Sequence, residues 1–366
     1  MWQGRLPREI FEIGQQGYAA AEPVAYPDGL EVIDCGLGTN PLGMPKVLCR
    51  FLEGGCSCNL CDYPAPEPED LKAAIASAHG GWGVTPRQVL VGGGSIGVLV
   101  TLVRILLRPG SVMSGVSPQF TDPVLQALYS GASYDPVPLE APRYGIETGR
   151  LMEALGKKPE VLYLDRPHNP TGQVLPLEDL ARLARKAMET GTWVISDEAY
   201  GDFLPDGESA AVLDFPNIVT CRSFSKGLGG AGIRVGFAVI RDPELADLFR
   251  KVQPPFVIGT LDVCAALEVL KEGAFLEETR AYVRMAKTRV LEAVRRRPGW
   301  SVAETDRRVP IFLLSQESGS LVQRLAAAGI SCEGGSGYFG MDDRSVRLRV
   351  PSPAKLEAFL ERIEKA

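Results

Sequence analysis

One lysine lies in a setting suited to covalent chemistry. Lys226 follows Ser223 and Ser225 in a glycine-rich segment, and Arg234 comes eight positions after the lysine. Apolar surroundings favour the neutral form of a lysine, and the neutral amine is the nucleophile that forms a Schiff base. Two hydroxyls and a guanidinium can together bind a phosphate. An isolated motif of this kind is usually a surface loop, so the rest of the chain has to decide between the two interpretations.

A second candidate anion site follows the apolar run 88–91. Gly94, Ser95 and Ile96 lie at the turn into a long apolar segment that predicts a helix ending at Leu107. Backbone N–H groups at the start of a helix bind anions, and the helix dipole adds to the attraction. We therefore expect these three residues to contribute backbone donors to a phosphate.

The same glycines also permit a dinucleotide-binding interpretation. Gly92, Gly94 and Gly97 satisfy the G-x-G-x-x-G pattern. That pattern requires an acidic residue about 20 positions later to bind a ribose, and the next predicted strand, 111–116, does not end in one. A nicotinamide-dependent oxidoreductase is therefore only a remote alternative, and it leaves Lys226 without a role.

Polar or aromatic side chains follow three other predicted strands. Phe120 comes after the strand 111–116, Asn169 after the apolar run 161–164, and Asp197 and Tyr200 after 192–196. Open α/β sheets bind ligands outside the carboxyl ends of their strands. An aspartate there can pair with a protonated ring nitrogen, a tyrosine can bind a phenolic oxygen, and an aromatic ring can face a planar ligand.

The elements that position these residues form two units. Strands and helices alternate from Gln88 to Ile240, which predicts an α/β fold with a mostly parallel sheet and helices on both faces. We expect a large three-layer ligand-binding domain over residues 31–255. A smaller α+β domain would combine residues 1–30, including an amphipathic helix from Arg8 to Ala21, with residues 256–366.

The composition narrows the class of protein. The chain has 366 residues, a net charge of −6 and no long basic run, which argues against nucleic acid and anionic membranes as partners. Its first nine residues lack the apolar core of a signal peptide. We therefore expect a cytoplasmic enzyme that acts on small molecules.

Cysteines cluster early in the chain. Cys56, Cys58 and Cys61 form a C-x-C-x-x-C motif, with Cys49 upstream. Paired C-x-x-C units and neighbouring histidines are missing, since the only two histidines are His79 and His168. We predict no metal site and expect reduced thiols.

Together these motifs resemble the fold-type I pyridoxal-phosphate (PLP) enzymes, specifically the class I/II aminotransferases of the histidinol-phosphate aminotransferase-like group. The resemblance runs from about Asn40 to Phe359, and its specificity comes from the order and spacing of the motifs. It implies PLP as cofactor and a Schiff base at Lys226. Its implied cofactor-binding residues are Tyr63, Gly94, Ser95, Ile96, Phe120, Asn169, Asp197, Tyr200, Ser223, Ser225 and Arg234. Lys226, Asp197 and Tyr200 are the implied catalytic residues.

The resemblance also implies partners. Tyr63 corresponds to a tyrosine that reaches the phosphate from the neighbouring subunit, so a homodimer is expected. Arg347 corresponds to the arginine that binds the anionic group of the substrate. Arg349, two residues later on the same predicted strand face, is expected to form an exposed ion pair.

Three positions bear on the substrate. Relatives that act on phosphorylated substrates usually carry a second arginine where this chain has Glu333, and a carboxylate there would repel a phosphate. Asn40 lies in the turn-rich segment 38–43, which is expected to line the substrate site. His168 replaces the usual asparagine before Asn169, and we expect a neutral substitution.

The resulting prediction is an aminotransferase. Its substrates would be a 2-oxo acid and an amino acid that has a carboxylate and a neutral or cationic side chain, and Lys226 would move the proton. Other PLP chemistry on the same scaffold stays open, because fold and cofactor do not dictate the reaction. The alternatives are a decarboxylase similar to threonine-phosphate decarboxylases and a specialised biosynthetic lyase, cyclase or oxidase.

Overall fold

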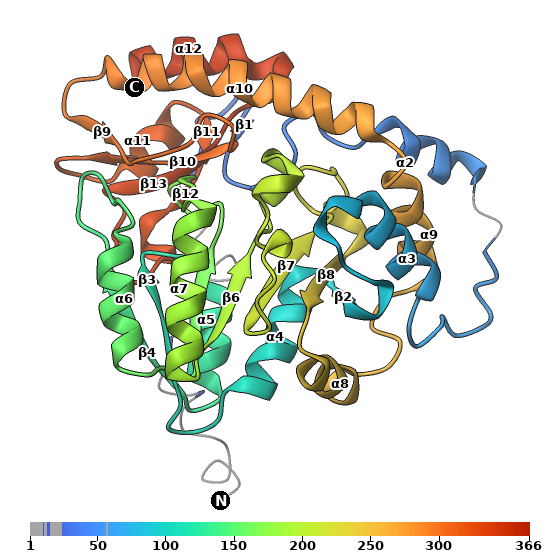
Figure 1. The fold of residues 1–366 in the computed structure, drawn as a ribbon. Coiled ribbons are helices and arrows are strands. Elements are labelled where there is room, and N and C mark those ends of the chain that lie inside the picture. Colours follow the sequence, from blue (N-terminus) through green and yellow to red (C-terminus); the bar gives the residue numbers. More distant parts are fainter. Residues whose placement is uncertain (1–9, 11–12, 15–23, 56–57) are drawn as a thin grey trace, which may run out of the picture.

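A seven-stranded sheet forms the centre of the computed structural model, which describes Ile10, residues 13–14, 24–55 and 58–366 (Figure 1). The strand order is β2-β8-β7-β6-β5-β3-β4. Only β8 runs antiparallel to its neighbours. The strands are β2 (Val89–Gly93), β3 (Val112–Ser117), β4 (Ser133–Pro138), β5 (Val161–Asp165), β6 (Trp193–Asp197), β7 (Ile218–Ser223) and β8 (Val235–Ile240).

Helices cover both faces of this sheet because its strands are apolar on both sides. On one face lie α4 (Gly94–Leu106), α5 (Thr121–Tyr129) and α8 (Pro243–Val252). The other face is covered by α6 (Thr148–Gly156) and α7 (Leu177–Thr190) at one end, and by α2 (Lys46–Arg50), α3 (Glu69–Ala78) and α9 (Thr260–Val269) at the other. This is the three-layer arrangement that the sequence predicted.

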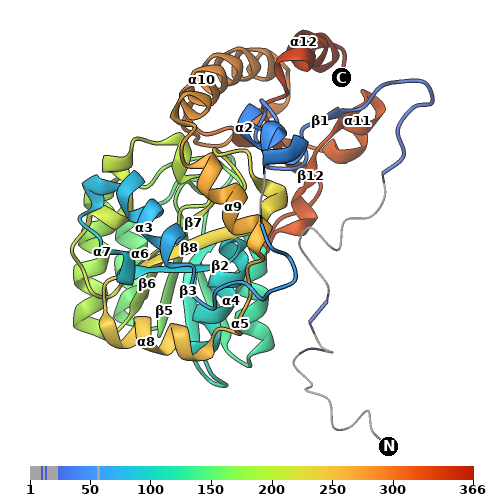
Figure 2. The same ribbon diagram turned by 90° about the vertical axis from the view of Figure 1, so that its right-hand side faces the viewer.

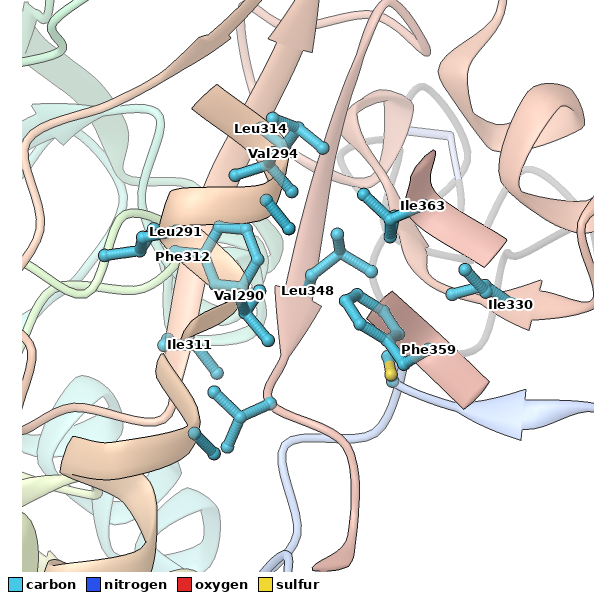
Figure 3. Close-up of a cluster of buried hydrophobic side chains, with 14 of the residues drawn as sticks. Val290, Leu291, Val294, Ile311, Phe312, Leu314, Ile330, Leu348, Phe359 and Ile363 are labelled. Atoms are coloured by element: carbon cyan, nitrogen blue, oxygen red, sulfur yellow. The ribbon is translucent and has the colours of Figure 1, made fainter. Parts of the chain in front are cut away.

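The C-terminal unit has its own sheet and core. Its antiparallel order is β12-β13-β10-β9. Figure 3 shows apolar side chains of β10 and β13, such as Phe312 and Leu348, packed against side chains of α10 and α12, such as Val290 and Phe359. The elements are α10 (Gly273–Arg295), β9 (Trp300–Val302), β10 (Ile311–Gln316), α11 (Leu321–Ala327), β11 (Ile330–Ser331), β12 (Glu333–Gly334), β13 (Ser345–Arg349) and α12 (Leu356–Lys365).

The N-terminal strand belongs with this C-terminal unit. β1 (Ile33–Asp34) pairs in parallel with β11, and Ile33 and Cys35 lie in the same hydrophobic cluster as α10 and α12. Helix α9, in contrast, packs on the large sheet. Figure 2 shows α10 and α12 beyond one end of that sheet. The predicted domain limits stay a prediction, and these contacts favour limits near residues 38 and 272.

Most predicted elements are present within a few residues, and α8 has the predicted bounds. The sequence pattern did not reveal β4, α5 or α6. The predicted helix from Arg8 to Ala21 lies largely outside the described residues. Among the described residues, no helix is both long and apolar enough to cross a membrane.

Candidate active site

Lys226 lies just beyond the carboxyl end of β7, in the loop that leads to β8. Its Nζ is 5.2 Å from the centre of the Tyr200 ring, which comes from the segment after β6. Gly38 closes the other side, because a Cβ at this position would overlap the Tyr200 hydroxyl and lie 3.1 Å from Lys226 Nζ. The lysine amine, the tyrosine and a bare stretch of backbone therefore meet in one place.

The predicted phosphate site is assembled beside this lysine loop. Arg234 Nη1 donates to Ser225 Oγ at 3.2 Å, and a Cβ on Gly94 would overlap the Arg234 guanidinium. Gly94 begins α4 with a positive φ of 72°, and the first turn of α4 has no acidic residue. A guanidinium, hydroxyls and a helix N-terminus converge here, which is the chemistry that binds a phosphate.

Gly236 allows β8 to approach the start of α4 closely at the same place. A Cβ on Gly236 would overlap the backbone N of Ser95, so only glycine fits where β8 passes the start of α4. Ser223, at the end of β7, accepts from Ser225 N at 3.1 Å. These contacts fix the loop between the serines and the helix start.

An acidic group lies at the end of the neighbouring strand. Asp197 is 3% exposed, its Oδ1 accepts from Ala199 N at 3.0 Å, and its Oδ2 accepts from the Tyr163 hydroxyl at 2.9 Å. Burial raises the pKa of Asp197 to about 6, although these hydrogen bonds and the charge of Lys226 oppose the shift. A cationic ring nitrogen would complete the pair and keep the carboxylate ionised.

The Tyr200 hydroxyl is an orphaned polar atom. The side chain is 3% exposed, and its oxygen has no hydrogen-bond partner among the described residues. Burying an unpaired hydroxyl is unfavourable by about 1–3 kcal/mol. An oxygen of a bound ligand would satisfy it, so this atom supports a ligand that fills the space beside Lys226.

Asn169 links this space to the C-terminal unit. Its Oδ1 accepts from the Tyr338 hydroxyl at 3.1 Å and from Arg347 Nη1 at 3.2 Å. The asparagine is 5% exposed and follows β5. It therefore lies between the predicted cofactor residues and the predicted substrate arginine.

Arg347 is completely buried on β13. Besides Asn169, its guanidinium donates to the Gly36 carbonyl and forms an ion pair with Glu333. β12 runs antiparallel to β13, and Glu333 lies directly opposite Arg347 in the register. The carboxylate that was expected at the far end of the substrate instead contacts the arginine itself.

The exposure of Arg349 differs from the prediction. The side chain forms an ion pair with Asp34 at 3.2 Å, as predicted, but it is 4% exposed and also donates to the carbonyls of Leu37, Asp34 and Val350. The expected exposure is therefore wrong for the arginine. The reason is that the segment 34–37 covers β13, and a sequence pattern does not reveal that contact. Arg349 fastens this segment to the C-terminal unit.

Asn40 lies beneath the lysine loop. Its Nδ2 donates to the Gly227 carbonyl at 2.8 Å and to Thr279 Oγ1 at 3.1 Å, and its Oδ1 accepts from Leu42 N at 2.8 Å. These contacts position the residue that follows Lys226. Its predicted contact with substrate stays a prediction.

Tyr63 lies on the surface. It is 83% exposed and stacks on Phe256, with 4.9 Å between ring centres. Phe256 is itself 41% exposed, and the backbone of Val257 faces Gly93, next to the phosphate site. An exposed aromatic pair at this position is available to a partner subunit.

His168 is buried beside Pro118 and Thr171, and its predicted lack of effect on function stays a prediction. Its Nδ1 and Nε2 lie 2.8 Å from Thr171 Oγ1 and 2.9 Å from the Pro118 carbonyl, and burial lowers the pKa of the imidazole to about 4. It therefore supports the turn that carries Asn169. The same turn follows Asp165, a buried aspartate to which the sequence analysis gave no role.

The cysteine motif is described in part. Cys61 is exposed, Cys58 Sγ is 2.9 Å from the free thiol of Cys264, and Cys56 lies outside the described residues. Cys58 takes part in a disulfide, though not with Cys264, so the expectation of reduced thiols is wrong for Cys58. In the described part of the chain, no group of three or more histidine, cysteine or acidic side chains could hold a metal.

The assembled site offers a phosphate-binding end, an acidic end, and a lysine and a tyrosine between them. A planar cofactor with one phosphate, one basic ring nitrogen and one phenolic oxygen matches these groups in number and kind.

Phe120 lies at the start of α5, and its backbone N donates to Asp165 Oδ2 at 2.8 Å. Its predicted stacking on a planar ring stays a prediction.

Comparisons with known proteins agree with this chemistry. The family model for aminotransferase class I and II matches residues 45–363. Histidinol-phosphate aminotransferase 1 of Mesorhizobium japonicum is 30% identical over 89% of this chain and 88% of its own length. The corresponding enzyme of Symbiobacterium thermophilum is also 30% identical, over 92% of this chain and 91% of its own.

Solved structures show the same fold. The histidinol-phosphate aminotransferase of Sinorhizobium meliloti, in complex with pyridoxal-5′-phosphate, superposes with a TM-score of 0.80 at 23% identity, covering 92% of this chain and 91% of that one. An aspartate aminotransferase tetra mutant of Thermus thermophilus gives 0.79 at 23% identity, over 98% and 99%. The predicted fold class is confirmed, and the chain is an enzyme that belongs to the class I and II aminotransferases.

Proposed function

We propose that this aminotransferase uses PLP, held at Lys226, to move an amino group between an amino acid and a 2-oxo acid in the cytoplasm. The observation that carries the proposal is the position of Lys226 Nζ over the ring of Tyr200, whose hydroxyl has no partner among the described residues. The charge of Lys226 acts on Asp197, and the Ser225–Arg234 pair lies in the same loop. When bound, PLP supplies an electron sink for the bonds of the substrate carbon that carries the amine. The chain supplies the residues that bind, orient and move protons.

The cofactor would be held at four places. Its phosphate would take the backbone N–H groups of Gly94, Ser95 and Ile96, the hydroxyls of Ser223 and Ser225, and Arg234. Its phenolic oxygen would take the Tyr200 hydroxyl and Asn169. The ring nitrogen would pair with Asp197, and Phe120 would face the ring.

Lys226 is the residue that moves the proton. With its amine free, Nζ of Lys226 would be the base that takes up the proton of the reacting substrate carbon and the acid that gives it back. Tyr200, whose ring lies beneath Nζ, keeps the lysine in place. Gly38 leaves the room that this exchange of amines needs.

The substrate class follows from Arg347 and Glu333. A bidentate arginine is the usual partner of a carboxylate, and Arg347 contacts Asn169 and the Gly36 carbonyl. Glu333 places a negative charge beside it, so a second anionic group such as a phosphate is disfavoured. We propose an amino acid with a neutral or cationic side chain, although the named relatives act on histidinol phosphate.

The proposal includes a homodimer in which Tyr63 reaches the phosphate of the partner subunit. It is supported by the exposure of Tyr63 and Phe256 beside the Gly93 backbone. Lys226→Ala and Tyr63→Ala variants, each impaired alone, should recover activity when mixed, because one site of a hybrid dimer then has both residues. No recovery after confirmed subunit exchange would contradict a contribution across the interface.

The direct test is the visible absorbance of the purified protein with a panel of amino acids. We expect a yellow protein whose absorption changes to that of pyridoxamine phosphate with one donor class. Lys226→Ala should lose the covalent attachment, and Lys271→Ala, an exposed lysine on the same chain, should keep it. A colourless wild-type protein in excess PLP would refute the proposal, and carbon dioxide release without pyridoxamine phosphate would favour a decarboxylase.

A further inference from the structure

A second carboxylate, that of Asp165, lies beside Asp197, the predicted partner of the cofactor ring nitrogen. Asp165 ends β5, and Asp197 ends the parallel neighbour β6, where the two residues are paired in register. Both side chains point to the same face of the sheet, because each lies two residues beyond a residue of the same core cluster, Tyr163 and Ile195. Asp165 is 5% and Asp197 is 3% exposed.

Asp165 joins two segments of the proposed cofactor site. Its Oδ2 accepts from Phe120 N at 2.8 Å and from Asn169 N at 3.4 Å. Phe120 comes from the segment after β3 and Asn169 from the segment after β5. One oxygen therefore fixes both the proposed ring-stacking residue and a proposed ligand of the phenolic oxygen.

The electrostatic surroundings of Asp165 oppose a second negative charge. Burial and the neighbouring Asp197 raise the pKa of Asp165, and hydrogen bonds from Phe120 N, Tyr163 and Asn169 N only partly oppose this shift. Asp165 acts in turn on Tyr134. Among the described residues, no lysine or arginine forms an ion pair with Asp165, whereas Lys226 and Glu198 act on Asp197. Two buried carboxylates this close cannot both ionise readily, so the pair retains a proton.

The hydrogen bonds indicate which carboxyl group carries this proton. The Tyr163 hydroxyl has one proton, and it donates that proton to Asp197 Oδ2 at 2.9 Å. Asp197 also accepts from Ala199 N, so both of its oxygens are satisfied as acceptors. Asp165 Oδ1, in contrast, is buried without an acceptor contact in the described part of the chain. A charged oxygen there would be strongly disfavoured, and a protonated one much less.

We propose that Asp165 is a positioning residue for the cofactor ring. Asp165 holds Phe120 and Asn169 in place, and it carries the proton of the carboxyl pair so that Asp197 remains ionised. The inference rests on the proposed function where it concerns the ring. The claim that Asp165 carries the proton concerns the protein alone and does not depend on the cofactor. The direction of titration supports it, since burial and the neighbouring Asp197 raise the pKa of Asp165 to about 8.

The test compares Asp165→Asn and Asp165→Ala with wild type. Asparagine keeps the acceptor oxygen and imitates the protonated acid, whereas alanine removes the acceptor from Phe120 and Asn169. Asp214→Asn, on an almost fully exposed side chain, is the matched control. In equilibrium dialysis, PLP should bind Asp165→Asn within about threefold of wild type and Asp165→Ala about tenfold or more weakly, the loss expected for a buried group left unpaired.

The second measurement uses the apoprotein. The unfolded aspartate has a pKa near 3.9, so between about pH 4 and pH 8 the folded protein binds a proton that the unfolded chain does not. Wild-type stability should therefore fall as the pH rises through this range, and Asp165→Asn should lose that fall. Urea midpoints at about pH 5 and pH 8 measure it, and the infrared band of a buried protonated carboxyl group in the wild type, which should vanish at higher pH, provides a check that needs no variant.

Each outcome decides a different claim. Parallel pH dependence of wild type and Asp165→Asn, or no such infrared band, would overturn the assignment of the proton to Asp165. PLP affinity of Asp165→Asn as low as that of Asp165→Ala would overturn the positioning role. Failure of the wild type to bind PLP would instead refute the proposed function, and the apoprotein comparison would still test the proton.

Discussion

Glu333 and Arg347 face each other across neighbouring antiparallel strands and form an ion pair in the buried part of the C-terminal unit. The arginine is completely buried, and the glutamate side chain is 15% exposed. The chain thus supplies its own carboxylate to the arginine that the proposed function assigns to substrate. Substrate and Glu333 compete for one guanidinium.

This competition predicts the effect of Glu333→Gln. Removing the charge leaves Arg347 more attractive to a substrate carboxylate, so KM for the amino acid should fall about tenfold, or about 1.4 kcal/mol. The preference for basic over neutral side chains should shrink as well. Glu361→Gln, on the exposed face of α12, is the control. Steady-state kinetics with matched basic and neutral donors measures both effects, and unchanged discrimination would contradict the role of Glu333.

The same pair predicts a dependence on pH. Burial raises the pKa of Glu333, although the neighbouring Arg347 opposes this shift. As the pH falls, Glu333 takes up a proton sooner than an ordinary glutamate and releases Arg347. KM for a carboxylate substrate should therefore decrease toward lower pH in the wild type and remain flatter in Glu333→Gln. The pH profile of kcat/KM distinguishes the two variants.

Tyr200→Phe should maintain or raise the stability of the apoprotein but weaken the binding of the cofactor. It removes a buried hydroxyl without a partner among the described residues, so the apoprotein should unfold at the same or higher urea concentration. Cofactor affinity should fall about tenfold with the lost hydrogen bond. Tyr134→Phe is the matched control, because the Tyr134 hydroxyl donates to the Val116 carbonyl and its loss should destabilise the apoprotein.

Gly38→Ala tests the space beside Lys226. The new Cβ would overlap the Tyr200 hydroxyl and crowd Lys226 Nζ, so kcat should fall about 100-fold or more, as for a misplaced catalytic group. Gly232→Ala, in the loop between β7 and β8, meets no atom within 4 Å and should retain activity. Similar activity of the two variants would contradict the proposed position of Lys226.

Lys287→Met tests a buried lysine outside the active site. Its Nζ lies 2.6–2.7 Å from four acceptors, Thr305 Oγ1 and the carbonyls of Asp306, Val309 and Ile311, which share its three protons. Methionine would leave these acceptors buried and unpaired, and we expect about 3 kcal/mol of destabilisation. Lys271→Met, on an exposed lysine, should change the urea midpoint little.

The groups at strand ends could be predicted from the sequence, because a strand followed by glycine or an acidic residue is a local pattern. Lys226 lies over the Tyr200 ring and acts on Asp197, and Ser225 contacts Arg234, as such patterns predict. Contacts between distant segments were harder to anticipate. The burial of Arg349 under segment 34–37, the pairing of Glu333 with Arg347, and the neighbours of Asp165 all depend on which strands lie side by side. A buried aspartate at a strand end was the one local signal that went unused.

The pairing of β1 with β11 has a consequence for how the protein is made. Residues 33–34 must find residues 330–331, and the next few residues then supply the carbonyls that hold Arg347 and Arg349 and the glycine beside Lys226. These contacts join segments that are far apart in the sequence, so they cannot form while residues 330–349 are still inside the ribosome. We expect the catalytic site to mature late in synthesis, once these residues have emerged.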